Sequence, residues 1–327
     1  GRPGATACGE RIALKANVEL PAEAILAVDH GAEGIGLYRT EFLYIDRATM
    51  PSEDEQYEIY RAVLEAVGNR PVTLRTFDIG GDKFASTFQL PAEMNPALGL
   101  RAVRLALKEP EVFLTQLRAM VRASAHGDLR IMIPMVTTVP EMRAAREFVA
   151  RAVEEVRAAG RTCRQDIPVG MMIEVPSAAI MADTFAREAD FFSLGTNDLV
   201  QYALAIDRTS QSLADLASPF DPSILRLIHA ATRAALARGI PISICGAMAS
   251  DPLAACLLVG LGLRDLSMEA AAIPEIKEAV RRITVREAEA VAEATLGCDS
   301  ATAVTETLTE AFAPRLADLL SGYGDEA

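Results

Sequence analysis

Short apolar runs rich in β-branched residues alternate with amphipathic helical patterns along almost the whole chain. The runs that predict strands span residues 11–18, 34–39, 72–78, 129–135, 169–175, 191–195, 242–246 and 264–268. Near-continuous apolar strands separated by helices are typical of a parallel sheet that is covered on both faces. Eight strands with eight helical connections predict an α/β fold of the (β/α)8 TIM barrel type.

Several helix boundaries can be predicted from the sequence. The pattern over 52–68 begins at Ser52 with an acidic first turn, and the patterns over 141–160 and 222–239 each end on glycine, as helices often do. The segment from 284 to 321 predicts two or three extra helices beyond the last barrel strand.

These patterns predict one domain that spans residues 11–321 and includes the C-terminal helices. We expect the segment 1–10 and the tail 322–327 to be loose. An open doubly wound sheet is the alternative fold. The glycines of GAEGIG do not have the Rossmann spacing and IGGDK is not a Walker loop, so the barrel is favoured.

The net charge limits the partners of the protein. Its 327 residues carry 32 Lys and Arg against 45 Asp and Glu, a formal charge of −13. This balance argues against a nucleic acid or an anionic membrane as partner, so an anionic substrate must be attracted by a local group of cations. The five cysteines are scattered without a CxxC motif, and we see neither a signal peptide nor a bilayer-length apolar run. These features predict a cytoplasmic protein with reduced thiols.

Polar residues end several of the predicted strands. The stretch SLGTNDLVQYALAIDR, residues 193–208, begins as a buried strand and then changes abruptly to an amide and a carboxylate. In a TIM barrel, polar residues at the C-terminal strand ends usually serve the active site. The residues in this position are Arg39, Arg75, Asp78, Glu174, Asn197, Asp198 and Cys245.

Each of these residues also has a purely structural interpretation. Arg39 could pair with Glu41, and Asn197 and Asp198 could cap the helix that follows them. Cys245, taken alone, is more often a small core hydrophobe than a reactive group.

Taken together, the strand-end residues have a coherent chemistry. Glu174 could instead bond a neighbouring loop, but with Asp198 on the next strand it forms an oxygen site that suits Mg²⁺. Arginines opposite such an ion grip phosphate and carboxylate groups bidentately. The residues therefore indicate Mg²⁺-dependent chemistry on a small phosphorylated carboxylic acid, with the thiol of Cys245 as proton donor or nucleophile.

Seven motifs resemble those of one known family in sequence and in order. They are GIGLYRTEFLY, LRTFDIGGDK, NPALGLRAVR, RIMIPM, MIEVPSA, DFFSLGTNDLVQYALAIDR and ICGAMASDP. The chain thereby resembles, from about residue 10 to 281, the C-terminal domain of the Enzyme I family, the phosphoenolpyruvate–protein phosphotransferases of the bacterial sugar phosphotransferase system. It is more distantly similar to the phosphoenolpyruvate-binding barrel of pyruvate phosphate dikinase.

The resemblance implies a transferase that binds phosphoenolpyruvate and Mg²⁺ and releases pyruvate. The phosphoryl group would pass to a histidine of a separate N-terminal domain and from there to the carrier protein HPr. The chain contains no GGxxSHxA-like segment for that histidine, so we expect this domain to be absent from it. The family likeness also implies a homodimer.

The resemblance also implies roles for single residues. Glu174 and Asp198 would coordinate Mg²⁺, and Cys245 would protonate the methylene carbon of enolpyruvate. Residues that would contact the substrate, or in the last two cases add positive charge nearby, are Arg39, Arg75, Asn197, Asp198, Arg208, Arg101 and Lys83.

One position departs from the family pattern. Ala247 follows Cys245 and Gly246 where the family usually has glutamate. The missing carboxylate leaves a more positive field, which we expect to lower the pKa of the thiol and to weaken it as a donor. Two alternatives therefore stay open: a phosphoenolpyruvate-sensing regulatory module without turnover, and a barrel like that of pyruvate phosphate dikinase.

Overall fold

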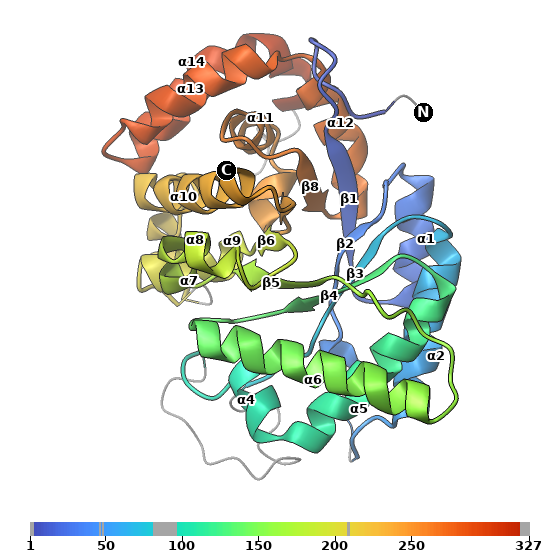
Figure 1. Ribbon diagram of the computed structural model, residues 1–327. Helices are drawn as coiled ribbons and strands as arrows, with labels where there is room; N and C mark the ends of the chain where they lie inside the picture. Colours follow the sequence, from blue (N-terminus) through green and yellow to red (C-terminus); the bar gives the residue numbers. More distant parts are fainter. Residues whose placement is uncertain (1–2, 46, 48, 81–96, 208–209, 321–327) are drawn as a thin grey trace.

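Eight parallel strands close into a barrel in a computed structural model that describes residues 3–45, 47, 49–80, 97–207 and 210–320 (Figure 1). Each strand pairs with the next along the chain, and β8 pairs with β1. The strands are β1 Ala13–Val18, β2 Ile35–Tyr38, β3 Val72–Arg75, β4 Leu129–Ile133, β5 Val169–Ile173, β6 Phe192–Leu194, β7 Ile242–Ile244 and β8 Asp265–Met268. The closed sheet confirms the predicted TIM barrel, and each observed strand lies within a predicted one.

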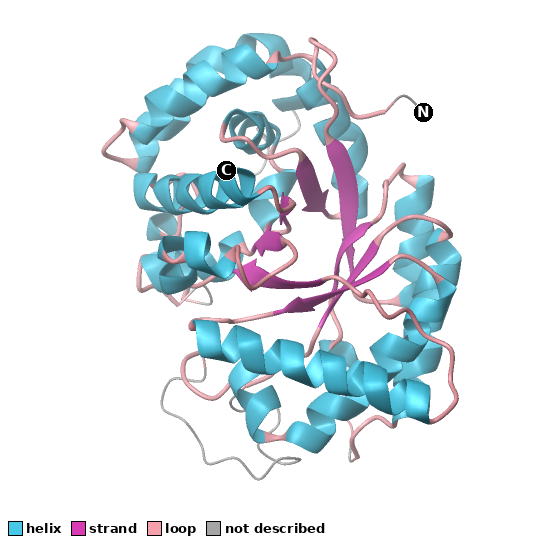
Figure 2. Cartoon of the chain, viewed as in Figure 1, coloured by secondary structure: helices cyan, strands magenta, loops and turns pink. Residues whose placement is uncertain are grey.

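Helices surround the barrel (Figure 2). They are α1 Pro21–Asp29, α2 Glu53–Val67, α4 Val103–Lys108, α5 Pro110–Ala123, α6 Val139–Ala158, α7 Pro176–Ile180, α8 Ala182–Phe185, α9 Thr196–Ala203, α10 Pro222–Arg238, α11 Pro252–Gly260, α12 Ile273–Arg281, α13 Val285–Leu296 and α14 Ala301–Leu320. The helices that were predicted from their boundary residues correspond to α2, α6 and α10. None of the described helices is both long and apolar enough to cross a membrane.

Local chemistry explains where α2 begins. The Ser52 hydroxyl accepts a hydrogen bond from the Glu55 amide at 3.2 Å, and the Glu55 carboxylate accepts one from the Ser52 amide at 2.8 Å. This capping box satisfies two amides that the first helical turn leaves free. The helix then buries its apolar stripe, which includes Tyr60, Val63 and Leu64, and ends before Gly68.

The N-terminal segment packs against the barrel from its first described residues. Ala5 and Arg11 form an antiparallel bridge, and the Ala7 amide donates to the Ile283 carbonyl at 2.8 Å. The packed part of the chain thus begins before residue 11, because backbone pairing holds a segment that its terminal position suggested to be loose. The tail 322–327 lies outside the described residues.

The C-terminal helices cover α11, which is apolar on every side. Helices α13 and α14 lie in an arc over α11 at the top of the view (Figure 1), and both pack on it. A helix without a polar face has to be buried. The extra helices that the sequence predicted therefore complete the burial of the last barrel helix but one.

Close approach of α11 and α13 depends on Gly260. A Cβ atom at this position would lie 2.1 Å from the Ala288 carbonyl oxygen and 3.0 Å from the Ala292 Cβ. Contacts this short cannot be accommodated without a shift of one helix.

We expect Gly260→Ala to reduce the free energy of unfolding by about 1–3 kcal/mol, because a side chain there forces α11 and α13 apart. Gly297→Ala is the matched control: its Cβ would meet one atom at 3.3 Å, and Gly297 has a φ of −84°, so the change should cost about 0.5 kcal/mol or less. Thermal unfolding followed by circular dichroism compares the two. Equal melting temperatures would show that the α11–α13 contact is not tight.

Candidate active site

A cavity of about 1230 Å³ opens at the C-terminal ends of the strands. Seven of the predicted site residues line it: Arg39, Arg75, Arg101, Glu174, Asn197, Asp198 and Cys245. They come from the ends of five different strands or from the segments that follow them, and the barrel brings them together because all its strands run in the same direction. Lys83 and Arg208 lie outside the described residues.

Arg75, the last residue of β3, is buried and paired. Its Nη2 lies 3.1 Å from Glu41 Oε1, and its Nη1 lies 3.3 Å from Asp78 Oδ2. The suggested structural pair of Arg39 with Glu41 is wrong: Arg39 Nη1 lies 2.7 Å from Glu19 Oε1, and Glu41 turns to the buried guanidinium instead. Burial alone would lower the pKa of Arg75, but the carboxylates around it outweigh burial and raise that pKa.

Arg101 reaches the same place from the loop before α4. It donates to Asp78 Oδ1 from Nε at 3.1 Å and from Nη2 at 2.8 Å, and to the Tyr202 hydroxyl from Nη1 at 2.9 Å. Its Nη1 also lies 3.9 Å from Asp198 Oδ1. Gly80 allows this position, because a Cβ there would lie 2.2 Å from the Cβ of Arg101.

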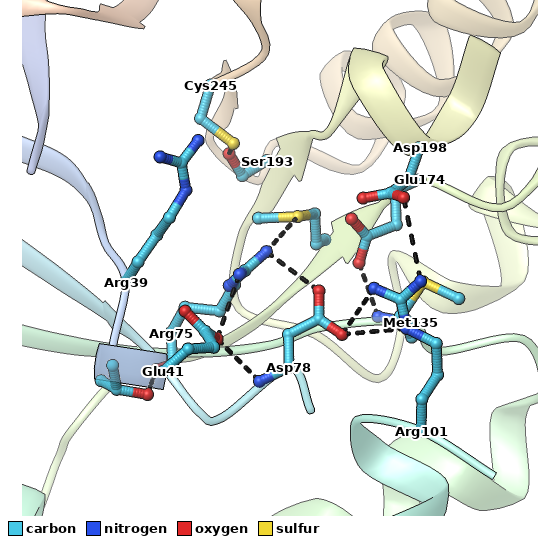
Figure 3. A network of polar contacts seen from close by, with 12 residues as sticks. Arg39, Glu41, Arg75, Asp78, Arg101, Met135, Glu174, Ser193, Asp198 and Cys245 are labelled. Carbon is cyan, nitrogen blue, oxygen red and sulfur yellow. Dashed lines mark hydrogen bonds and ion pairs between the residues drawn. The ribbon is translucent and has the colours of Figure 1, made fainter. Parts of the chain in front are cut away.

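Three carboxylates face one another across the cavity (Figure 3). One oxygen from each of Asp78, Glu174 and Asp198 lies within 4.8 Å of the other two. Glu174 and Asp198 were predicted as a pair, whereas Asp78 was noted at its strand end without a metal-binding role. The signal for Asp78 was its place in LRTFD, three residues after Arg75.

Glu174 is the most deeply buried member of this acidic triad, with 1% of its surface exposed. Its Oε1 accepts from the Met135 amide at 2.6 Å, and Met135 has a φ of +55°, an unusual conformation for a residue other than glycine. Burial, followed by the charges of Asp78 and Asp198, raises the pKa of Glu174 to about 8.

The triad fits a divalent cation. Packing three carboxylates together in a buried place is unfavourable unless a positive charge compensates them. Within the described residues, the buried Asp198 Oδ1 has no hydrogen-bond partner. Hard oxygen donors, one of them without a hydrogen-bond partner in the described part of the chain, are what a Mg²⁺-type ion needs.

Asn197 and Asp198 do not cap a helix, contrary to the structural interpretation. The residue that precedes α9 is Gly195, so both side chains lie within the first helical turn. Asn197 Oδ1 accepts from the Ala247 amide at 3.0 Å and so joins the first turn of α9 to the segment after β7. With its oxygen engaged, the side-chain amide has Nδ2 as the donor for a cavity ligand.

Cys245 lies at the edge of this cavity, 4% exposed. The hydroxyl of Ser193, in β6, donates to its Sγ at 3.2 Å. The thiol belongs to a small apolar cluster with Leu37, Met132, Met172 and Phe191. Cys245 is therefore a core side chain that also faces the cavity.

The effect of Ala247 on the Cys245 pKa stays a prediction, but that pKa lies above, not below, the ordinary value of a thiol. Burial raises the pKa of this thiol to about 11, and the opposing effects of the Ser193 hydroxyl and of Arg75 and Arg39 are smaller. Sequence reasoning counted the arginines but not the apolar surroundings. At neutral pH the group is a protonated thiol, the form that a proton donor requires.

Alkylation should distinguish Cys245 from exposed Cys8. The Thr6 hydroxyl and backbone hydrogen bonds lower the pKa of Cys8, and only thiolates react quickly. At pH 7.5 we expect iodoacetamide to modify Cys8 at least about tenfold faster than Cys245, as followed by peptide mass spectrometry. Faster modification of Cys245 would mean that the arginines ionise it.

Fold and site together define a class: a (β/α)8 barrel whose mouth gathers arginines around three carboxylates, as binding of an anion with a cation requires. A family model described as "PEP-utilising enzyme, PEP-binding domain" matches residues 2–285. The chain belongs to this family of phosphoenolpyruvate-binding domains.

Curated relatives are phosphoenolpyruvate-protein phosphotransferases. That of Bacillus subtilis is 45% identical over 304 residues, which is 93% of this chain and 53% of that protein. That of Lactococcus lactis subsp. cremoris is 48% identical over 286 residues, 87% of this chain and 50% of that protein. The chain thus spans about half the length of these relatives.

Solved structures with low sequence identity share the barrel. A malate synthase from Haloferax volcanii is 14% identical with a TM-score of 0.52, covering 82% of this chain and 68% of that one. A HpcH/HpaI aldolase/citrate lyase family protein from Burkholderia cenocepacia is 13% identical with a TM-score of 0.50, covering 82% of this chain and 91% of that one. At this identity the likeness concerns the fold alone.

Proposed function

We propose that this chain is the phosphoenolpyruvate-binding catalytic half of a phosphoenolpyruvate–protein phosphotransferase. It would take the phosphoryl group from phosphoenolpyruvate, pass it to a histidine of a separate domain and release pyruvate. The observation that carries the proposal is the convergence of Arg75, Arg101 and the acidic triad in one cavity, in a chain of this family.

The cations and the amide of the cavity suit the anionic groups of the substrate. Arg39 and Arg75 would hold the phosphate, with Asn197 Nδ2 as a further donor, and Arg101 would add positive charge. The proposal also includes Lys83 and Arg208, which lie outside the described residues. Guanidinium groups fit phosphate and carboxylate oxygens because their N–H groups point in parallel pairs.

The acidic triad would hold Mg²⁺. We propose Glu174 and Asp198 as ligands, with Asp78 beside them, on the strength of their oxygen distances. When bound, the cation would neutralise negative charge on the phosphoryl oxygens during transfer.

Cys245 would complete the reaction at carbon. When the bond between phosphorus and the enol oxygen breaks, the enolate must gain a proton at C3 to become pyruvate. The Cys245 thiol would give this proton and become a thiolate, toward which the Ser193 hydroxyl already donates. The thiolate would then take a proton from water.

The proposed partners rest on the family resemblance of the sequence motifs. We propose a cytoplasmic homodimer. The phosphoryl group of phosphoenolpyruvate would pass through an N-terminal histidine domain to the carrier protein HPr.

A second candidate function is a module that senses phosphoenolpyruvate without turnover. It is supported by exposed Ala247, which stands in place of an acid near Cys245.

Exchange of the methyl protons of pyruvate with D₂O tests the role of Cys245. With Mg²⁺ present, we expect Cys245→Ala to slow exchange by about 100-fold or more, because a general acid contributes that much. Phosphoenolpyruvate should still bind. Proton NMR measures exchange, and Cys163→Ala is the matched cysteine control, expected to exchange normally.

Three outcomes separate the candidates. Wild-type exchange that Cys245→Ala retains would remove Cys245 from the mechanism. Wild-type binding without exchange would favour the sensing module. A wild-type chain that binds no phosphoenolpyruvate would contradict the proposed function.

A further inference from the structure

Charged side chains alternate in sign along one wall of the cavity. Glu41 pairs with Arg75 at 3.1 Å, Arg75 with Asp78 at 3.3 Å, and Asp78 with Arg101 at 2.8 Å. All four side chains are largely buried, and that of Asp78 is only 4% exposed. The carboxylates of Glu41 and Asp78 therefore neutralise the guanidinium groups of Arg75 and Arg101.

Asp78 belongs to two sets of groups at once. One of its oxygens receives two N–H donors of Arg101, and the other faces Arg75. It is also a member of the acidic triad, within 4.8 Å of Glu174 and Asp198. Asp78 therefore contacts both guanidinium groups and also belongs to the place for a cation (Figure 3).

This position creates a conflict for an incoming anion. A phosphate would compete with Asp78 for the N–H groups of Arg75 and Arg101 that now point at this carboxylate. An anion that binds without a cation would face the buried charge of Asp78, and like charges at short range repel strongly where water is excluded. A cation at the triad would relieve both problems by attracting the carboxylate.

We propose that Asp78 is an electrostatic lock that couples binding of the cation to binding of the substrate anion. Without a cation it holds Arg75 and Arg101. With a cation at the triad, its charge is compensated there and the guanidinium groups are released to the anion. This proposal rests on the proposed function, since it concerns the same substrate.

Two buried polar atoms of the cavity lack hydrogen-bond partners in the part of the chain that the structure describes. Arg75 Nε and Asp198 Oδ1 have no hydrogen-bond partner among the described residues. One is a donor beside the guanidinium pairs, and the other is an acceptor within the triad. An anion on the first and a cation on the second would satisfy both, as simultaneous binding requires.

Glu41 provides the matched control. It bonds Arg75 Nη2 and accepts from the Asp78 amide at 2.7 Å, so it neutralises the same guanidinium. It is not a member of the triad. Removal of its charge should strengthen anion binding without uncoupling it from the cation.

Isothermal titration of the full chain with phosphoenolpyruvate, with and without Mg²⁺, tests the lock. For wild type we expect Mg²⁺ to tighten binding by a factor within about 5–150, the usual range for coupled sites. In Asp78→Asn we expect this factor to fall to about 3 or less, because the affinity without Mg²⁺ rises. Glu41→Gln should keep the wild-type factor.

The outcomes are distinguishable. An unchanged Mg²⁺ factor in Asp78→Asn, or an equal loss of the factor in Glu41→Gln, would overturn the lock while leaving the proposed function intact. A wild-type chain that binds no phosphoenolpyruvate in either condition would overturn the proposed function itself. Circular dichroism checks folding, and Asp78→Ser replaces the asparagine variant if that variant is unfolded.

Discussion

The site depends on the pairing of one buried guanidinium, that of Arg75, with carboxylates from two directions. A charged group at the end of a barrel strand is costly unless partners surround it. Glu41 and Asp78 are those partners, at 3.1 and 3.3 Å. Through Asp78 this pairing extends to Arg101 and to the acidic triad, so each side chain in the cavity wall is held by the charge of the next.

The barrel reduces the conformational entropy that this arrangement loses when a ligand binds. Most of the side chains project from the ends or first turns of packed elements, and Arg101 is held in its loop by Asp78 and Tyr202. Little freedom therefore remains to be lost when a ligand binds. Strained or close-packed backbone supports it: Met135, with its positive φ, places an amide on Glu174, and Gly80 admits Arg101. Rigid charges that already point at a ligand contribute more to phosphoryl transfer than groups that must reorganise.

Sequence reasoning reached the eight strands because periodicity and strand-end polarity are local signals. It also reached the convergence of Arg75, Glu174, Asp198 and Cys245, since parallel strands of a closed barrel end on the same face. The ion pairs were harder to predict from the sequence. Arg39 pairs with Glu19 and not with Glu41, because the fold and not the spacing along the chain decides which carboxylate lies near it. The raised pKa of Cys245 could not be predicted, because the apolar cluster around the thiol comes from segments far apart in the sequence.

The most direct test of the convergence is a crystal structure with phosphoenolpyruvate and Mn²⁺ in place of Mg²⁺, with anomalous scattering to locate the ion. We predict one Mn²⁺ peak at the carboxylates of Glu174 and Asp198, with the phosphate of the ligand against Arg75. An ion or a ligand bound outside this cavity, at full occupancy, would contradict the account.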